Sequence, residues 1–280
     1  MLIRSVMLVL MIAGAAVAVV CIVLGVLLWH VQERVVFQPP GPPYPGAQGT
    51  RRIDMRAEDG QPLFAYLVGE LPGTGLVLTF HGNADLAGWQ IPWAAELSRR
   101  TGRAVLLAEF RGYGGLPGAP THAGTRLDAR AAYAVARDTL GVPHERIALY
   151  GHSLGSAIAT ELAEEVSPEV LVMVAPMTSA RQMAHRISPG AVLLFWTGLA
   201  RVHYDTEAIV RSLNTPAWVA HGVHDTVIPV EMGQRVFAAA KVQGELLVLD
   251  TAGHNDVVEQ GGERYWQWLG RSLRTGPVSH

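Results

Sequence analysis

The residues with the clearest capacity for chemistry surround Ser153, in a segment, 151–155, that reads Gly-His-Ser-Leu-Gly. The apolar residues before it, 147–150, predict a strand, and the residues after it, 156–163, predict a helix. So sharp a turn needs both glycines, because larger side chains beside the serine would collide with the chain. The pattern predicts a raised serine nucleophile at a helix N-terminus, where backbone N–H groups favour negative charge. A serine that only caps the helix is the competing interpretation.

This strand, G-x-S-x-G turn and helix resemble the nucleophile elbow of the alpha/beta-hydrolase superfamily. The resemblance runs from about Val35 to Leu269 and is especially to membrane-anchored serine hydrolases related to protein depalmitoylases and monoacylglycerol lipases. It implies an α/β fold, with a mostly parallel sheet, helices on both faces and a short helical cap. In this superfamily the catalytic residues follow in the order serine, aspartate, histidine, so the acid and the base are expected in the C-terminal half.

Two later segments are similar to the family's acid and base loops. Residues 221–229 read His-Gly-Val-His-Asp-Thr-Val-Ile-Pro, similar to G-x-x-D-x-x-V/I-P, and imply Asp225 as the acid. Residues 250–256 read Asp-Thr-Ala-Gly-His-Asn-Asp, similar to G-H-N-D, and imply His254 as the base. The alternatives are that Asp225 only caps the next helix, or that the carboxylate comes from Asp250 or Asp256.

An oxyanion hole requires two backbone N–H groups near the nucleophile. The resemblance implies Leu154, directly after the serine, and Asn83, in the loop 81–84 that reads His-Gly-Asn-Ala and is similar to the family's H-G-N-A loop. An ordinary strand-to-helix turn is the other interpretation of that loop.

Other polar residues near these segments are expected to have structural roles. The segment 109–118 resembles the family's D-x-R-G-Y-G-x-S-x-G loop, with Glu109 in place of Asp and Leu116 in place of Ser, and we expect it to hold the floor of the site. No spacing of histidine and aspartate suggests a metal site, and no cofactor is predicted. Packing or hydrogen bonding is the expected role of three further histidines: His152, His221 and His224.

The elements that must position these residues follow from alternating patterns. Short apolar runs rich in Val, Leu and Ile alternate with longer helical patterns, which is typical of a parallel sheet wrapped by helices. Strands are expected at 76–80, 104–108, 147–150, 170–174, 217–220 and 246–249. Crossover helices are expected at 86–100, 121–140, 230–240 and 255–269.

The N-terminal region predicts a membrane anchor. Residues 6–29 contain no charged side chain, and as a helix they span about 36 Å, enough for a hydrocarbon core of about 30 Å. A cleaved signal peptide is the competing interpretation, because residues 16–18 read Ala-Val-Ala, but the apolar sequence continues well beyond them. We therefore predict a single-pass anchor at 1–34, a Pro- and Gly-rich linker at 35–49 and a hydrolase domain at 50–280. Arginines flank the span on both sides, so the sequence does not predict on which side of the membrane the hydrolase domain lies.

Composition excludes some classes of function. The 22 Lys and Arg and 24 Asp and Glu leave a net charge of −2, which provides no basic surface for nucleic acid. Cys21 is the only cysteine, so an internal disulfide is excluded.

The insertion at about 177–213 departs from the strand pattern, and the resemblance implies that it caps the site. Its apolar run at 191–196 either lines an acyl pocket or packs on the core.

Together these features predict a serine hydrolase for acyl esters or thioesters, lipid-like or carried on protein, that acts through an acyl-enzyme. The rival from another class is a catalytically silent, membrane-tethered binding module on the same fold. Dehalogenases and epoxide hydrolases resemble this family but use an aspartate nucleophile, and Ser153 argues against that chemistry. Acyl chain length and leaving group depend on the shape of the pocket.

Overall fold

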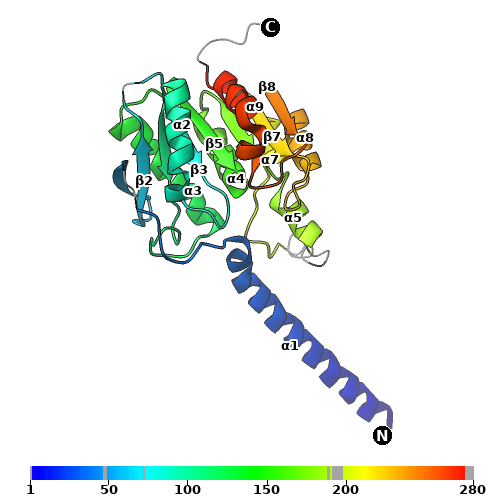
Figure 1. Ribbon diagram of the computed structural model, residues 1–280. Helices are drawn as coiled ribbons and strands as arrows, with labels where there is room; N and C mark the ends of the chain where they lie inside the picture. The colour runs from blue at the N-terminus through cyan, green and yellow to red at the C-terminus, as the bar shows by residue number, and fades with distance from the viewer. Residues whose placement is uncertain (1, 47–48, 72, 188–189, 191–197, 275–280) are drawn as a thin grey trace.

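An eight-stranded sheet lies at the centre of the part of the chain that the structure describes (Figure 1). This computed structural model describes residues 2–46, 49–71, 73–187, 190 and 198–274. The strand order is β1-β2-β4-β3-β5-β6-β7-β8. The strands are β1 (Arg51–Arg56), β2 (Pro62–Val68), β3 (Leu76–Phe80), β4 (Ala104–Ala108), β5 (Ile147–His152), β6 (Leu171–Val174), β7 (Ala217–Gly222) and β8 (Gln243–Leu249).

Strands β3 to β8 are parallel and correspond to the six apolar runs in the sequence. β3 and β4 have the expected ends, whereas β8 begins at Gln243 instead of residue 246. Strands β1 and β2 form an antiparallel hairpin that the sequence analysis did not predict, and β2 also pairs antiparallel with β4. The hairpin extends the sheet beyond its parallel part. Because six of the eight strands are parallel, the predicted mostly parallel sheet is confirmed.

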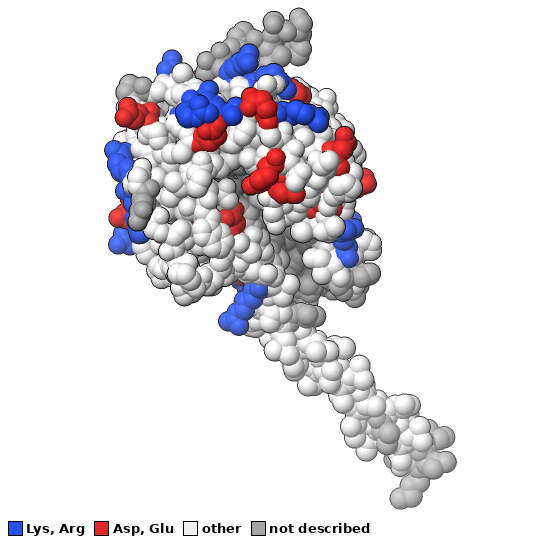
Figure 2. Space-filling view, in the orientation of Figure 1, with Lys and Arg blue, Asp and Glu red and all other residues white. Residues whose placement is uncertain are grey.

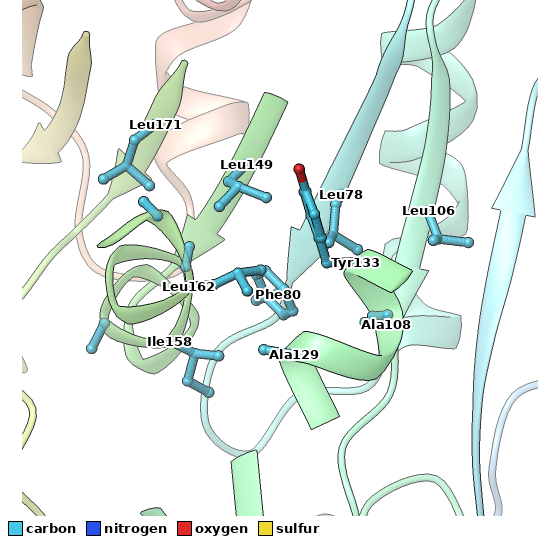
Figure 3. Close-up of a cluster of buried hydrophobic side chains, with 14 of the residues drawn as sticks. Leu78, Phe80, Leu106, Ala108, Ala129, Tyr133, Leu149, Ile158, Leu162 and Leu171 are labelled. Carbon is cyan, nitrogen blue, oxygen red and sulfur yellow. The ribbon is translucent and has the colours of Figure 1, made fainter. Parts of the chain in front are cut away.

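Helices cover both faces of the sheet because alternate strand residues point to opposite faces. The helices are α2 (Ile91–Thr101), α3 (His122–Ala134), α4 (Leu154–Val166), α8 (Val230–Ala239) and α9 (Val257–Ser272). On β3, Leu78 and Phe80 belong to the buried cluster under α3, α4 and α8, while Val77 belongs to the cluster under α2 and α9. Figure 3 shows the first cluster, in which side chains of β3 and β5 face those of α3 and α4.

Helix α1 (Leu2–Val36) projects away from the domain (Figure 1). Its segment Ser5–Val36 is long and apolar enough to cross a membrane, and the domain buries none of its most apolar stretch. The helix continues into the first two residues of the predicted linker, 35–49. The next residue, Phe37, is only 3% exposed and joins the core cluster. This junction is therefore packed against the domain.

The predicted cap insertion, 177–213, contains two described helices, α5 (Ala180–Ile187) and α7 (Thr206–Val210). We call residues 198–205, which precede α7, the returning limb of the insertion. The hydroxyl of Tyr204 in this limb hydrogen-bonds to Thr125 on α3 at 2.7 Å and so fixes the limb to the domain. The apolar run at 191–196 lies outside the described residues.

Candidate active site

The carboxyl ends of four parallel strands bring the predicted site residues to one edge of the sheet. β3 leads into the loop with Asn83, β5 into Ser153, β7 into the loop with Asp225, and β8 into the loop with His254. Ligands of open α/β sheets bind outside this edge, where loops from neighbouring strands converge. Parallel pairing therefore assembles residues that lie far apart in the sequence.

Ser153 occupies the turn between β5 and α4 in a strained backbone conformation, with φ 53° and ψ −117°. Its N–H donates to the carbonyl of Val174 at 2.8 Å, which fixes the turn against the end of β6. Both flanking glycines are needed for space. A Cβ on Gly151 would lie 2.3 Å from the carbonyl oxygen of Gly155, and one on Gly155 would lie 2.0 Å from that of Phe80.

His254 lies between the serine and a carboxylate. Its Nε2 is 3.0 Å from Ser153 Oγ, and its Nδ1 is 2.7 Å from Asp225 Oδ2. Because the carboxylate can only accept, the proton of a neutral imidazole stays on Nδ1 and leaves Nε2 free to accept from the hydroxyl. The structure thus brings together the three residues expected from the sequence.

Asp225 is held by donors on both carboxylate oxygens. Oδ1 accepts from the backbone N–H groups of Val227 at 2.8 Å and Ile228 at 2.7 Å. Oδ2 faces His254 and also the buried His221, whose Nε2 is 3.2 Å away. Burial alone would raise the pKa of Asp225, but the hydrogen bonds from His221 and His254 outweigh it and hold that pKa well below its ordinary value. The carboxylate is therefore ionised at neutral pH.

The two alternative carboxylates, those of Asp250 and Asp256, lie in other surroundings. Asp256 immediately precedes α9 and accepts from the backbone N–H of Gly253 at 2.6 Å. Asp250 is exposed in the turn after β8. Among the three candidates, Asp225 is the one that contacts His254.

His152 supports the loop that carries His254. Its Nε2 donates to the backbone carbonyl of His254 at 3.0 Å. Burial, together with the neighbouring imidazole, lowers the pKa of His152 to about 4, so this side chain is neutral at physiological pH. His152 and His221 thus have the hydrogen-bonding roles expected of them, but no motif in the sequence indicates that His221 lies beside the acid.

The loop after β3 rests on a buried pair. His81 Nε2 lies 2.7 Å from Glu109 Oε1, and His81 Nδ1 lies 2.8 Å from the carbonyl oxygen of Gly82. Both ring nitrogens therefore face acceptors. Burial lowers the pKa of His81, but the charge and hydrogen bond of Glu109 outweigh it and raise that pKa overall. Glu109, which also accepts from the N–H of Ala87, lies beneath the loop as the sequence analysis expected.

The two expected oxyanion donors, Leu154 and Asn83, come from neighbouring segments. Leu154 is the first residue of α4, where N–H groups lack partners within the helix. The close approach of Gly155 to the carbonyls of Phe80 and His81 brings this helix end against the loop that contains Asn83. The side chain of Asn83, in contrast, turns to the end of α1, and its amide nitrogen donates to the carbonyl of Val36 at 2.6 Å. No motif in the sequence predicts this contact.

The sequence matches known proteins over most of its length. The model of the family described as serine aminopeptidase, S33 matches residues 72–203. The uncharacterized protein Rv2307c of Mycobacterium tuberculosis is 34% identical over 251 residues, which cover 86% of this chain and 87% of that protein. The human alpha/beta hydrolase domain-containing protein 17B is 25% identical over 272 residues, which cover 86% of this chain and 88% of that protein.

Solved structures share the fold. The Pyrococcus furiosus esterase Pf2001 superimposes with a TM-score of 0.67 at 21% identity, over 84% of this chain and 98% of the esterase. The Rhodococcus esterase RhEst1 gives a TM-score of 0.58 at 18% identity, over 81% of this chain and all of that chain. The sheet order, the strained serine turn and these relatives agree. The chain is therefore a hydrolase of the alpha/beta-hydrolase superfamily.

Proposed function

We propose that the protein is a membrane-tethered serine hydrolase that cleaves acyl esters or thioesters, from lipid-like or acyl-protein substrates. One observation carries the proposal, the chain of contacts from Ser153 Oγ to His254 Nε2 at 3.0 Å and from His254 Nδ1 to Asp225 Oδ2 at 2.7 Å. A base stands beside the nucleophile and a carboxylate orients the base, which is the requirement for activating a serine hydroxyl.

The proposed reaction has two halves. His254 takes the proton of Ser153 as Oγ bonds to the acyl carbon, and the backbone N–H groups of Leu154 and Asn83 stabilise the oxyanion. Collapse breaks the bond to the leaving alcohol or thiol, which receives the proton from His254. Water then attacks the acyl-enzyme with His254 again as base, which releases the carboxylic acid and restores Ser153. Asp225 keeps the imidazole oriented and stabilises its charged form.

The preference for acyl substrates rests on the surroundings of the site. The apolar helix α1 leaves the domain beside the catalytic edge, because its end contacts the loop of Asn83. A serine site held close to lipid would meet acyl chains attached to lipids or to membrane-bound proteins. A single-pass anchor at residues 1–34 remains part of this proposal.

The test is labelling of the full-length, detergent-solubilised protein with a fluorophosphonate, which reacts with activated serines. We expect wild type to be labelled and Ser153→Ala not to be. The matched control is Ser156→Ala, because the hydroxyl of Ser156 donates to the backbone carbonyls of Gly151 and Val174. p-Nitrophenyl esters and thioesters of increasing chain length, assayed in parallel, measure which acyl chain and leaving group are preferred.

Labelling that persists in Ser153→Ala would contradict Ser153 as the nucleophile. Well-folded wild type that neither labels nor hydrolyses any of the esters would instead favour the catalytically silent binding module. Circular dichroism and the thermal midpoint of each variant separate loss of chemistry from loss of fold.

A further inference from the structure

The side-chain amide of Asn83 makes three hydrogen bonds, two of them with the end of α1 and the residue that follows it closely. Its Nδ2 donates to the carbonyl of Val36 at 2.6 Å, and its Oδ1 accepts from the backbone N–H of Gln38 at 2.8 Å. The hydroxyl of Tyr113 donates to the same Oδ1 at 2.8 Å. The amide thus bridges the C=O and N–H groups on either side of Phe37, much as a neighbouring strand would. We call these contacts between Asn83, Tyr113 and residues 36–38 the clasp.

The chain on the other side of the clasp is itself fixed. Phe37 is 3% exposed within the core cluster, so residues 36–38 cannot move without exposing its ring. One turn earlier, the carboxylate of Glu33 pairs with Arg201 at 2.8 Å, and the side chain of Gln32 donates to the carbonyl of Leu199 at 2.7 Å. The end of α1 is therefore held between the loop of Asn83 and the returning limb of the cap insertion.

Burial raises the pKa of Tyr113, so its phenol stays protonated and serves as a donor through the neutral and mildly alkaline range. All three hydrogen bonds of the Asn83 amide are then satisfied at the same time, and the side chain has one orientation. A fixed side chain restricts the backbone of the same residue, which includes the N–H that the proposed mechanism assigns to the oxyanion.

We propose that the clasp makes the end of α1 a positioning element of the active site, which sets the direction of the Asn83 N–H. This inference rests on the proposed function, because it concerns the oxyanion of that reaction. Donors to an oxyanion act only when they are fixed beforehand, and a small misplacement sacrifices much of their effect. The anchoring helix would then contribute to turnover itself, beyond keeping the enzyme at a membrane.

The test uses full-length protein in detergent with p-nitrophenyl butyrate, a short soluble ester for which membrane location is irrelevant. Asn83→Ala keeps the backbone N–H but removes the clasp from one side, and Phe37→Ala loosens it from the other. We expect each to lower kcat by about 10-fold with KM within about twofold, since less is lost than when a donor is deleted. Affinity for a boronic acid that mimics the tetrahedral intermediate should fall by the same factor as kcat.

Because both substitutions break one unit, the double variant should be no slower than about the slower single variant. Fluorophosphonate titration measures the concentration of intact sites. With kcat calculated per intact site, an unfolded fraction does not lower it. Tyr113→Phe removes one of the three hydrogen bonds without shortening the side chain, and we expect a smaller fall in kcat from it. The matched control is Val35→Ala, which truncates a 60% exposed side chain beside the clasp and should leave kcat unchanged.

Active wild type with kcat within twofold in both single variants would overturn the inference and leave the proposed function standing. Independent effects that multiply to about 100-fold in the double variant would also overturn it. Wild type that is neither labelled nor active would overturn the proposed function, and the positioning role with it.

Discussion

Asp225 receives two backbone N–H groups and two imidazoles on its carboxylate, so it fixes both the acid loop and the tautomer of His254. In Asp225→Asn an amide can present its NH₂ to Nδ1, which favours the tautomer with the proton on Nε2, where it cannot accept from Ser153. We expect kcat for a short ester to fall by about 10³- to 10⁴-fold while the thermal midpoint changes little.

The control for this substitution is Asp250→Asn, at the exposed aspartate in the turn after β8. Its kcat should stay within twofold of wild type. If Asp250→Asn or Asp256→Asn were the slow variant and Asp225→Asn were not, the assignment of the acid would be wrong.

His152 should make stability depend on pH. Its pKa is lowered to about 4 in the folded protein, against about 6.5 in an unfolded chain, so between these values the unfolded state binds more protons. Its contribution is complete above pH 6.5 and is lost as the pH falls toward 4. We expect wild type to lose on the order of 2 kcal/mol more than His152→Gln between pH 7 and pH 4. Urea unfolding at several pH values measures this, and parallel curves for the two proteins would contradict it.

At the level of single residues, the contacts among Ser153, Asp225 and His254 were predictable. A serine between glycines that is followed by aspartate and histidine in known loop patterns is rarely found outside a catalytic site. The partners of Asn83 and His221 were not predictable. Their positions depend on side-chain contacts between segments far apart in the chain, and no local pattern records such contacts.

Among the elements, the turn between β5 and α4 has very little space for a larger side chain. A methyl group on Gly155 would meet the carbonyl oxygens of Phe80 and His81, which belong to the backbone and cannot move cheaply. We expect Gly155→Ala to destabilise the protein by about 2–4 kcal/mol and to abolish fluorophosphonate labelling.

Gly270→Ala is the matched comparison for that substitution. Gly270 lies in α9, and a Cβ there meets nothing within 4 Å, so alanine should stabilise the helix by about 0.5–1 kcal/mol. Chemical unfolding of both variants compares them directly. Equal effects would mean that crowding at the elbow is not what selects glycine.

The parallel strands were predictable because strands buried on both faces are continuous apolar runs. The hairpin of β1 and β2 was missed because β1, Arg-Arg-Ile-Asp-Met-Arg, is mostly charged and lies at the edge of the sheet. The segment after α1 was expected to be a linker because proline and glycine exclude a helix. Those residues do not reveal whether a chain is free or packed, and here the burial of Phe37 shows packing.

On the scale of the whole molecule, charge is unevenly distributed over the face of the domain shown in Figure 2. Figure 2 shows most of the acidic and basic side chains of this face on the half of the domain away from α1. Outside α1, the large apolar side chains that are exposed in the described residues lie in the segment after α1 or in the connections that follow β3, β6 and β7. They are Tyr44, Trp89, Ile187, Leu199, Val223 and Val227. We therefore predict that this edge, from which α1 leaves, lies against the membrane in the proposed membrane-tethered enzyme.

An environment-sensitive dye can test this orientation. In a Cys21→Ser background, Val227→Cys places the dye at the catalytic edge, and Glu145→Cys places it before β5, at the opposite edge. In lipid nanodiscs we expect brominated lipids to quench the dye at 227 and to leave the dye at 145 unaffected. Equal quenching at the two sites would contradict a catalytic edge that faces the bilayer.

The strand order also governs when the enzyme becomes active during synthesis. Ser153 and its base are 101 residues apart, and the acid and the base follow β7 and β8, the last two strands to be made. If the proposed function is correct, a growing chain can fold its serine turn while the sheet still lacks the strands that lead to Asp225 and His254. The hydroxyl of such a chain has no base beside it, so the proposed hydrolysis would begin only when the final edge strand has joined the sheet.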